Sequence, residues 1–388
     1  MIYNKVLKTL EFSFALVLLA ACLAGCGDAP KATPEAPPDD GSADFARARV
    51  ELEKQNFPAA AAAFASAARK CETNLEARIQ LALINLRLGE VEAANVAATN
   101  AVETCPESAE AHLVAGQAAY LKKNYRRAVD LFAKVVAEKS LPDALRSDAL
   151  VGRGVVELAQ NASDAARISF LRAMRLSRRN PAAWYHLGVL SRDVYRFDEA
   201  ALEQFEMAAR FSNPNDARAV KISREIIPAL RKSIVSAAAS KPGVAKRDPA
   251  AATKLLAEGE ALQKKKNIRA AIKKYEAAFA ADPLSDAAAL KYATLVALND
   301  KTSAGVDKAL AAYRAVIDQR PEKQANYLAA ARLAYENKRW ATAAAIMDRA
   351  VSHDPENRQT LDLLIAALQK AGKTKQAEAW KAYRAEVK

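Results

Sequence analysis

The sequence contains few of the residues that catalytic and metal sites use. Its 388 residues include only three histidines and four cysteines. None of His112, His186 and His353 has a second ligand at the spacing of a zinc site, so we expect structural roles for all three. No HExxH, CxxC or nucleophile-elbow motif is present, and Gly152-Arg153-Gly154 lacks the third glycine of a dinucleotide-binding loop. We therefore expect no enzyme, no metal and no cofactor. The alternative is a catalytic site assembled from distant parts of the chain.

Glycine and aromatic residues are also scarce. The chain has 12 glycines, and aromatic residues make up 6% of it, whereas apolar residues reach 51% largely through alanine. Alanine is the strongest helix former. No window alternates β-branched and polar residues in the manner of a strand. This composition predicts an all-α protein built from short helices that pack closely together.

The first 26 residues have the organisation of an export signal. Lys5 and Lys8 precede an apolar stretch over residues 12–24, which as a helix of about 20 Å is too short for a hydrocarbon core of about 30 Å. The stretch ends in Leu23-Ala24-Gly25-Cys26, which resembles the lipobox of bacterial lipoproteins. The resemblance implies that Cys26 is the lipidated first residue of the mature chain. An ordinary signal peptide and an uncleaved anchor are the alternatives.

The residues that follow Cys26 bear on localisation. Residues 27–42 are polar and rich in proline, so we expect a disordered tether that reaches up to about 50 Å from the membrane. Position 27 is Gly and not Asp, which by resemblance to lipoprotein sorting favours the periplasmic face of the outer membrane over the inner membrane. Asp28 leaves the inner membrane open. The prediction is a lipid-anchored protein of the cell envelope.

A repeated pattern covers most of the remaining chain. Helix-ending prolines recur at intervals of 33 to 39 residues, and each unit carries an alanine, an apolar residue four positions later and a small residue three positions beyond. Ala60-Phe64-Ala67, Ala166-Phe170-Ala173 and Ala271-Tyr275-Ala278 are examples, and these spacings place the three residues on one helix face. Trp184, Leu187 and Gly188 form the corresponding stripe of a preceding helix. The pattern resembles the tetratricopeptide repeat family.

The resemblance implies a right-handed α-solenoid of about nine helix-turn-helix repeats. We predict an N-terminal array of about five repeats over residues 43–215 and a C-terminal array of about four over residues 250–388. The fifth repeat has one extra residue between its helices, and the seventh has about four in the polar stretch 299–308. Residues 216–249 are predicted to form an extra helix, kinked at Pro228, and a hinge between the arrays. A generic helical bundle or another α-solenoid is the alternative.

In this family the first helices of the repeats line a concave face that binds a protein or a peptide. The predicted register places these candidate binding residues on that face: Tyr120, Tyr185, Arg192, Tyr292, Arg332 and Tyr335. Tyrosine and arginine combine a wide contact area with polar ends, which suits recognition. Inter-repeat packing is the alternative role. The leading hypothesis is thus a membrane-anchored scaffold that binds an unidentified protein partner.

The charge is distributed unevenly and leaves a second function open. The net charge is +13, and residues 215–388 alone hold 32 Lys and Arg against 19 Asp and Glu. This excess favours an anionic partner for the C-terminal array. The alternative function is therefore binding of an anionic envelope polymer, such as peptidoglycan or an acidic polysaccharide. We expect no nucleic acid, because an exported lipoprotein seldom meets it.

Two cysteines remain in the folded part of the chain. Cys71 and Cys105 are 34 residues apart, which is one repeat period. An oxidising compartment and an even count favour a disulfide. Equivalent points on packed helices, however, lie about 8–10 Å apart, whereas a disulfide needs Cα atoms within about 7 Å. A Cys71–Cys105 bridge and two free thiols both stay possible.

Overall fold

A computed structural model describes residues 40–214, 216–239 and 247–387. The predicted signal peptide, Cys26 and all but the last residues of the predicted tether lie outside this range. Among the described helices, none combines the length and the hydropathy needed to cross a membrane. The described residues form helices and their connecting turns, without a strand, which confirms the all-α prediction.

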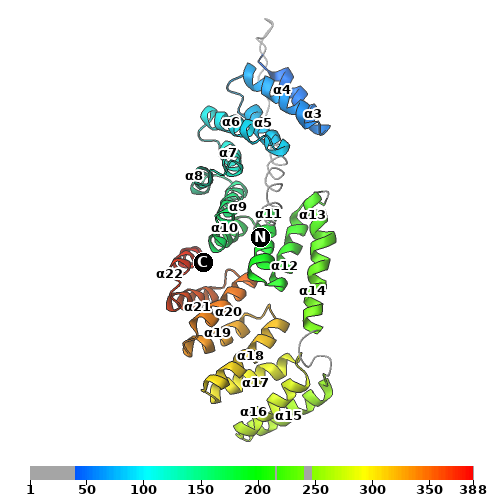
Figure 1. Cartoon of the computed structure of the whole chain (residues 1–388), viewed down its shortest axis with the longest axis vertical. Helices are drawn as coiled ribbons and strands as arrows, with labels where there is room; N and C mark the ends of the chain where they lie inside the picture. Colours follow the sequence, from blue (N-terminus) through cyan, green and yellow to red (C-terminus); the bar gives the residue numbers. More distant parts are fainter. Residues whose placement is uncertain (1–39, 215, 240–246, 388) are drawn as a thin grey trace. The chain divides into compact units, whose positions relative to one another are not determined.

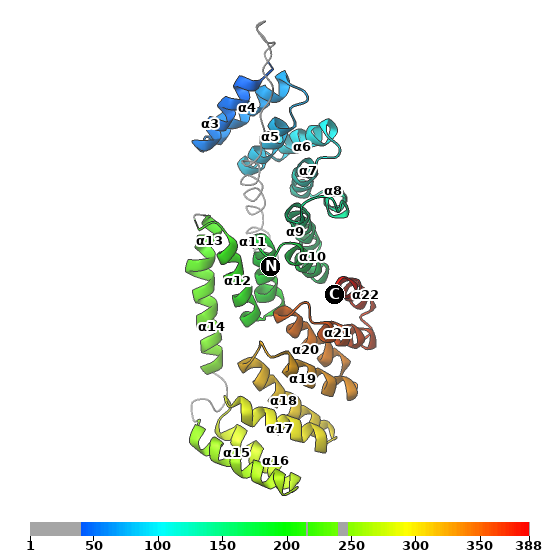
Figure 2. The same cartoon turned by 180° about the vertical axis from the view of Figure 1, so that it is seen from behind.

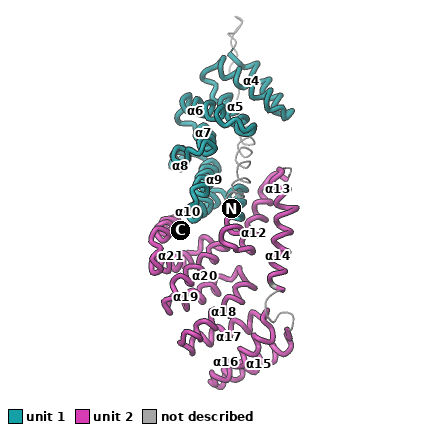
Figure 3. The backbone as a smooth tube through the Cα atoms, viewed as in Figure 1, with its two compact units in different colours: residues 1–189 teal, residues 190–388 magenta. Residues whose placement is uncertain are grey.

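The helices pair into hairpins that follow the predicted repeats. The chain consists of two compact units, unit 1 with residues 1–189 and unit 2 with residues 190–388 (Figure 3). Within each unit, neighbouring hairpins stack in chain order (Figures 1 and 2). In unit 1 the helices are α3 Ser42–Glu53, α4 Phe57–Lys70, α5 Leu75–Leu88, α6 Val91–Thr104, α7 Ala109–Leu121, α8 Tyr125–Ala137, α9 Asp143–Ala159, α10 Ser163–Leu176 and α11 Pro181–Val189.

Unit 2 begins with the π-helical turn η1 and contains the remaining hairpins. Its helices are η1 Leu190–Tyr195, α12 Asp198–Phe211, α13 Ala217–Lys221, η2 Ile222–Ile226, α14 Ile227–Ala239, α15 Pro249–Lys264, α16 Ile268–Ala281, α17 Asp286–Asn299, α18 Ser303–Gln319, α19 Gln324–Glu336, α20 Trp340–His353, α21 Arg358–Lys370 and α22 Thr374–Glu386. The observed fold is an α-solenoid of helix-turn-helix repeats, as predicted.

The repeated alanine and aromatic residues form the core. Every residue of the sets around Phe64, Phe170 and Tyr275 is fully buried. Alanine lets two helices approach closely, and the ring fills the space behind it. The ring of Phe132 shows how this joins successive repeats, because a Cβ atom on Gly116 of α7 would lie 2.6 Å from it and one on Gly152 of α9 would lie 2.5 Å from it. The first helices of two adjacent hairpins, α7 and α9, therefore both pack against the Phe132 side chain.

The turn within a hairpin has nearly the same conformation throughout the chain. One residue adopts a left-handed backbone at Gln55, Gly89, Lys123, Asn161, Arg196, Lys266, Lys338 and Gly372. This conformation ends a first helix and allows the second to start within a few residues. The hairpin α17–α18 differs, because Asp300 follows α17 in an extended conformation and Thr302 Oγ1 accepts a hydrogen bond from the Gly305 amide. The predicted insertion in the seventh repeat falls at this turn.

The fifth hairpin accommodates its extra residue in a π-helical turn. The sequence predicts one additional residue there, and η1 spans Leu190–Tyr195 directly after α11. A π turn absorbs one residue without breaking the helix. The boundary between the compact units falls at the start of this turn, between Val189 and Leu190.

The division into units differs from the predicted five-plus-four arrangement with a hinge at 216–249. Helix α12 of the fifth hairpin contacts α20 of the eighth (Figure 1). Gln204 Nε2 donates to the Ser352 carbonyl oxygen at 3.2 Å, and Arg349 Nη2 lies 3.4 Å from Glu199 Oε2. Because these contacts link residues about 150 positions apart, α12, α13, η2 and α14 belong to the same unit as the C-terminal repeats. The predicted kink at Pro228 is preceded by the π turn η2.

The buried carboxyl of Asp148 is expected to make the free energy of unfolding of unit 1 depend on pH. Its Oδ1 accepts a hydrogen bond from Asn180 Nδ2 at 2.8 Å, and Asn180 also caps α11. Burial raises the pKa of Asp148 to about 6. The folded chain therefore binds this proton more tightly than the unfolded chain, so the stabilisation is complete below about pH 4 and is lost as the pH rises through about 6.

The variant Asp148→Asn removes this ionisation and keeps an oxygen acceptor for Asn180. We expect the variant to exceed the wild type in free energy of unfolding by about 1–3 kcal/mol at pH 8, and by less at pH 4.5. Urea titrations at both pH values measure the difference. A difference of the same size at pH 4.5 and pH 8 would show that the carboxylate is not the cause.

Candidate functional site

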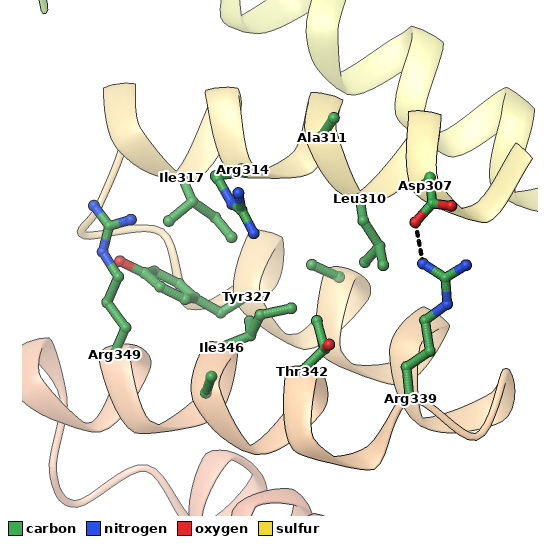
Figure 4. A pocket seen from close by; sticks show the side chains of 12 residues that line it. Asp307, Leu310, Ala311, Arg314, Ile317, Tyr327, Arg339, Thr342, Ile346 and Arg349 are labelled. Carbon is green, nitrogen blue, oxygen red and sulfur yellow. Dashed lines mark hydrogen bonds and ion pairs between the residues drawn. The ribbon is translucent and has the colours of Figure 1, made fainter. Parts of the chain in front are cut away.

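A cavity of about 390 Å³ lies between α18, α19 and α20 of unit 2 (Figure 4). The second helices of two consecutive hairpins, α18 and α20, form its walls, and α19 forms its floor. Its lining residues are Asp307, Leu310, Ala311, Arg314, Ile317, Tyr327, Ala330, Arg339, Thr342, Ala345, Ile346 and Arg349. A volume of this size is within the range of about 300–1,000 Å³ that ligand pockets have.

The spacing of the lining residues explains how the walls form. On α18 they recur three or four positions apart from Asp307 to Ile317, and on α20 the same spacing runs from Thr342 to Arg349. Residues at this spacing share one helix face. Alanine occupies a lining position on each of the three helices, at Ala311, Ala330 and Ala345. The small side chains leave the space that larger residues would fill.

One end of the cavity is closed by an ion pair. Arg339 Nη1 contacts Asp307 Oδ1, and Arg339 Nη2 donates to Ser303 Oγ at 2.8 Å (Figure 4). The hydrogen bond from Arg339 holds the pKa of the exposed Asp307 carboxyl below its ordinary value. This end of the cavity is therefore already neutralised by partners from the chain itself.

The opposite end presents hydrogen-bond donors that have no acceptor. Arg349 Nη1 lies 2.7 Å from Asp318 Oδ1, but among the described residues the buried Arg349 Nε has no hydrogen-bond partner. The Tyr327 side chain is fully buried, and its hydroxyl likewise lacks a partner within the described part of the chain. Burial raises the pKa of the Tyr327 phenol, so it keeps its proton and remains a donor. Figure 4 shows the Tyr327 hydroxyl on the side of Arg349.

Arg314 lies between the two ends and is the arginine of the cavity that is not neutralised. It is exposed on α18, and no described residue pairs with its guanidinium. The buried donors of Tyr327 and Arg349 differ from Arg314, because a buried donor without an acceptor lowers the stability of the fold by about 1–3 kcal/mol. A ligand oxygen that accepts their hydrogen bonds would recover this free energy. Leu310, Ile317 and Ile346 line the same space with apolar surface. The arrangement can thus hold an anionic group next to an apolar one.

The six residues predicted for the concave face have different surroundings. Tyr185 and Tyr292 are buried, with 8% and 4% of their surface exposed. The Tyr292 hydroxyl donates to Glu276 Oε1 at 2.8 Å, and burial raises its pKa. Tyr120 packs against Tyr125 with ring centroids 6.1 Å apart. These three side chains are thus engaged in packing within the repeats.

The remaining three differ in their surroundings. Arg192 lies in η1, where it forms two contacts with Asp193 at 2.7 and 2.8 Å and lies over the Phe205 ring. Arg332 is exposed on α19, and Tyr335 is partly buried three residues further along the same helix. Arg332 and Tyr335 are therefore the two that stay available to a ligand. That this face binds a partner stays a prediction.

The three histidines contact other residues of the chain, and the two described cysteines are not bonded to each other. His112 Nδ1 lies 2.8 Å from the Ser108 carbonyl oxygen, and the His186 ring stacks on Phe170 with centroids 4.9 Å apart. His353 Nδ1 lies 3.2 Å from Glu203 Oε2. These contacts agree with structural roles. The disulfide that the sequence left possible is not formed, since Cys71 and Cys105 are both free thiols.

The cavity was not found from the sequence, although a signal for it exists. Leu310-Ala311 is followed by Arg314, and Ala345-Ile346 is followed by Arg349. The same combination of one apolar residue, one alanine and one arginine a turn later thus recurs 35 residues apart on two second helices. The predicted binding residues lie on first helices, which line the concave face in this family, whereas the cavity lies between second helices.

The described residues form stacked helical hairpins with a lined cavity, the architecture of a helical repeat protein. The sequence profile described as Tetratricopeptide repeat matches residues 79–144 in unit 1 and residues 302–358 in unit 2, the second match covering α18, α19 and α20. These two stretches are tetratricopeptide repeats, and repeats of this kind support a role as a protein–protein interaction scaffold.

Comparison with solved structures finds similar helical repeats. A protein from the functional characterisation of Pseudomonas aeruginosa pilF has 17% identity and a TM-score of 0.40, with 52% of this chain and 94% of that chain covered. The tetratricopeptide repeat protein TTC0263 of Thermus thermophilus has 21% identity and a TM-score of 0.41, covering 48% and 99%. MamA of Desulfovibrio magneticus has 17% identity and a TM-score of 0.37, covering 46% and 98%. Comparison with curated protein sequences gives no match.

Proposed function

We propose that this chain is a lipid-anchored scaffold of the bacterial cell envelope that holds a segment of a partner protein in the cavity between α18, α19 and α20. The segment carries a carboxylate next to an apolar side chain. The carboxylate binds between Arg314 and the unpaired donors of Tyr327 and Arg349, and the apolar side chain contacts Leu310 and Ile346. The single observation that supports this most strongly is the pair of buried donors, at one end of an apolar cavity, that no described residue provides with an acceptor.

A carboxylate suits this site better than a neutral acceptor. Hydrogen bonds from a guanidinium to a carboxylate are about twice as strong as those between neutral groups. Asp307 and Asp318 already satisfy the outer atoms of Arg339 and Arg349, so the remaining positive charge is centred on Arg314. Among acidic segments, the apolar lining then favours those in which the side chain next to the carboxylate is apolar and of a size that fits the cavity.

Selection from a displayed library of random peptides tests the proposed site without knowledge of the partner. The full mature chain is the target, and a chain carrying Ala311→Trp, which fills the cavity, is the matched control. We expect the selected peptides to share an Asp, a Glu or a C-terminal carboxylate within about two residues of Leu, Ile, Met or Phe. Peptides that lack a carboxylate, or that bind the Ala311→Trp chain equally well, would contradict the proposal.

The membrane anchor rests on the lipobox-like residues that end at Cys26. Two or three acyl chains on one residue hold a protein to a bilayer stably, whereas one chain does so only marginally. Cells that express the wild-type chain and are fed labelled palmitate are expected to yield a labelled band in the membrane fraction. Cys26→Ser is expected to lose the label completely. Equal labelling of both chains would refute lipidation at this residue.

A further inference from the structure

The turns within the hairpins from α15 to α22 lie along one edge of their array. Consecutive helices run antiparallel, so the turns that join first to second helices share one edge and the connections between hairpins share the other (Figure 2). We name the first the turn edge, which consists of residues 263–269, 299–303, 336–340 and 369–375. Arg339 Nη2 donates to the Ser303 carbonyl oxygen at 3.1 Å, which joins two of these turns directly.

Charge is separated between the two edges. The turn edge contains ten Lys and Arg against two acidic residues. The opposite edge, residues 281–286, 319–323 and 353–358, contains three against five. The positive charge of the C-terminal half is therefore gathered along one side of unit 2 and is not spread over its surface.

Three lysines of the turn edge are exposed and form no ion pair with the described residues. Lys265, Lys338 and Lys375 are exposed, and their ammonium groups form no hydrogen bond or ion pair with a described residue. Lysines on the helix faces differ, since Lys274 lies 2.6 Å from Glu258 and Lys291 lies 2.9 Å from Glu260. These two helix lysines are thus paired with glutamates, whereas the three turn lysines have no ion-pair partner among the described residues.

Two features of the edge indicate the kind of anionic partner. Leu298, which directly precedes the second turn, is 65% exposed, and basic residues with an exposed apolar side chain are typical of surfaces that lie on a bilayer. A nucleic-acid strand would instead require exposed aromatic rings for stacking. Trp340 is the single aromatic residue of the turn edge, and it is partly buried.

We propose that the turn edge of unit 2 binds the anionic phospholipid headgroups of a membrane. Helices in adjacent layers lie about 8–10 Å apart, and the Debye length at physiological salt is about 8 Å, so lysines of neighbouring turns act on one patch of headgroups. Arg339 is shared by the turn edge and the closed end of the cavity, but Lys265, Lys338 and Lys375 do not line the cavity. The proposal therefore depends neither on a ligand in the cavity nor on Cys26.

Cosedimentation with vesicles tests this surface. A chain of residues 40–388, which contains every described helix and no lipidation site, is mixed with vesicles of phosphatidylglycerol and phosphatidylcholine or of phosphatidylcholine alone. We expect binding to the anionic vesicles only, with a partition coefficient that falls steeply as salt rises. Changing Lys265, Lys338 and Lys375 to Glu is expected to lower it by about 100-fold or more, because each lysine near an anionic bilayer contributes about fivefold.

The matched control changes Arg320, Lys323 and Arg358 of the opposite edge to Glu, which alters the net charge by the same amount. Its partition coefficient is expected to stay within about threefold of the wild-type value, and circular dichroism confirms that both variants are folded. Equal losses in both variants would refute the turn edge as the binding surface. Binding to a soluble acidic polysaccharide without binding to anionic vesicles would refute the membrane as the partner.

Discussion

Phe132→Ala is expected to lower the free energy of unfolding of unit 1 by about 3–5 kcal/mol. The Phe132 ring is 1% exposed and is enclosed by backbone of α7 at Gly116 and of α9 at Gly152. Removing the ring opens a cavity at the junction of two hairpins. Rigid helices cannot collapse fully into this cavity, so most of the lost packing is not recovered.

Urea titration followed by circular dichroism measures this change. Val96→Ala in α6 is the matched control, because Val96 is 56% exposed and its truncation removes little buried surface. We expect less than about 0.5 kcal/mol for the control. A Phe132→Ala chain as stable as the Val96→Ala chain would mean that the ring does not join the repeats.

Ala311→Trp is expected to weaken binding of a selected peptide by more than about 100-fold, the largest effect that we expect at the site. Ala311 is exposed on the wall of the cavity, so the larger ring occupies the space of the ligand without disturbing the core. Arg314→Glu replaces attraction by repulsion, and we expect about a 10- to 100-fold loss, since truncating one partner of a buried charge pair costs about 2–5 kcal/mol and this site is partly solvated.

Arg332→Glu is the control for charge. Arg332 is exposed on α19 but does not line the cavity. Isothermal titration calorimetry of the three variants is expected to show a change of less than about threefold for Arg332→Glu. A large loss for Arg332→Glu together with unchanged affinity for Arg314→Glu would place the ligand on the predicted concave face.

Much of the fold follows from local sequence patterns. The sets around Phe64, Phe170 and Tyr275 predicted which residues are buried, because spacings of three and four residues fix one helix face wherever a helix forms. The extra residue of the fifth repeat was predicted as well. Its accommodation as the π turn η1 was not, because a loop and a π turn have similar local sequence requirements.

The contact between α12 and α20 could not be predicted from repeat patterns. Glu199, Glu203 and Gln204 are polar residues on a second helix, and in a single repeat they are indistinguishable from solvent-facing residues. Their partners Arg349, Ser352 and His353 are about 150 residues away. Tertiary contacts at this separation depend on the path of the whole array and have no local signal.

The candidate site was predicted least well, for a related reason. Register along a first helix correctly placed Arg332 at the surface, but it could not tell that Tyr185 and Tyr292 pack inward, because tyrosine suits both a core and an interface. Alanines from three helices line the cavity. The sequence shows each alanine separately as a good helix former, and only the packed structure brings them together.

The structure of the chain in complex with a selected peptide would decide where the scaffold holds its partner. We expect the peptide carboxylate within hydrogen-bonding distance of Arg314 and the Tyr327 hydroxyl, and its apolar side chain between Leu310 and Ile346. A peptide that instead lies against Arg332 and Tyr335, with the cavity between α18 and α20 empty, would contradict the proposed function.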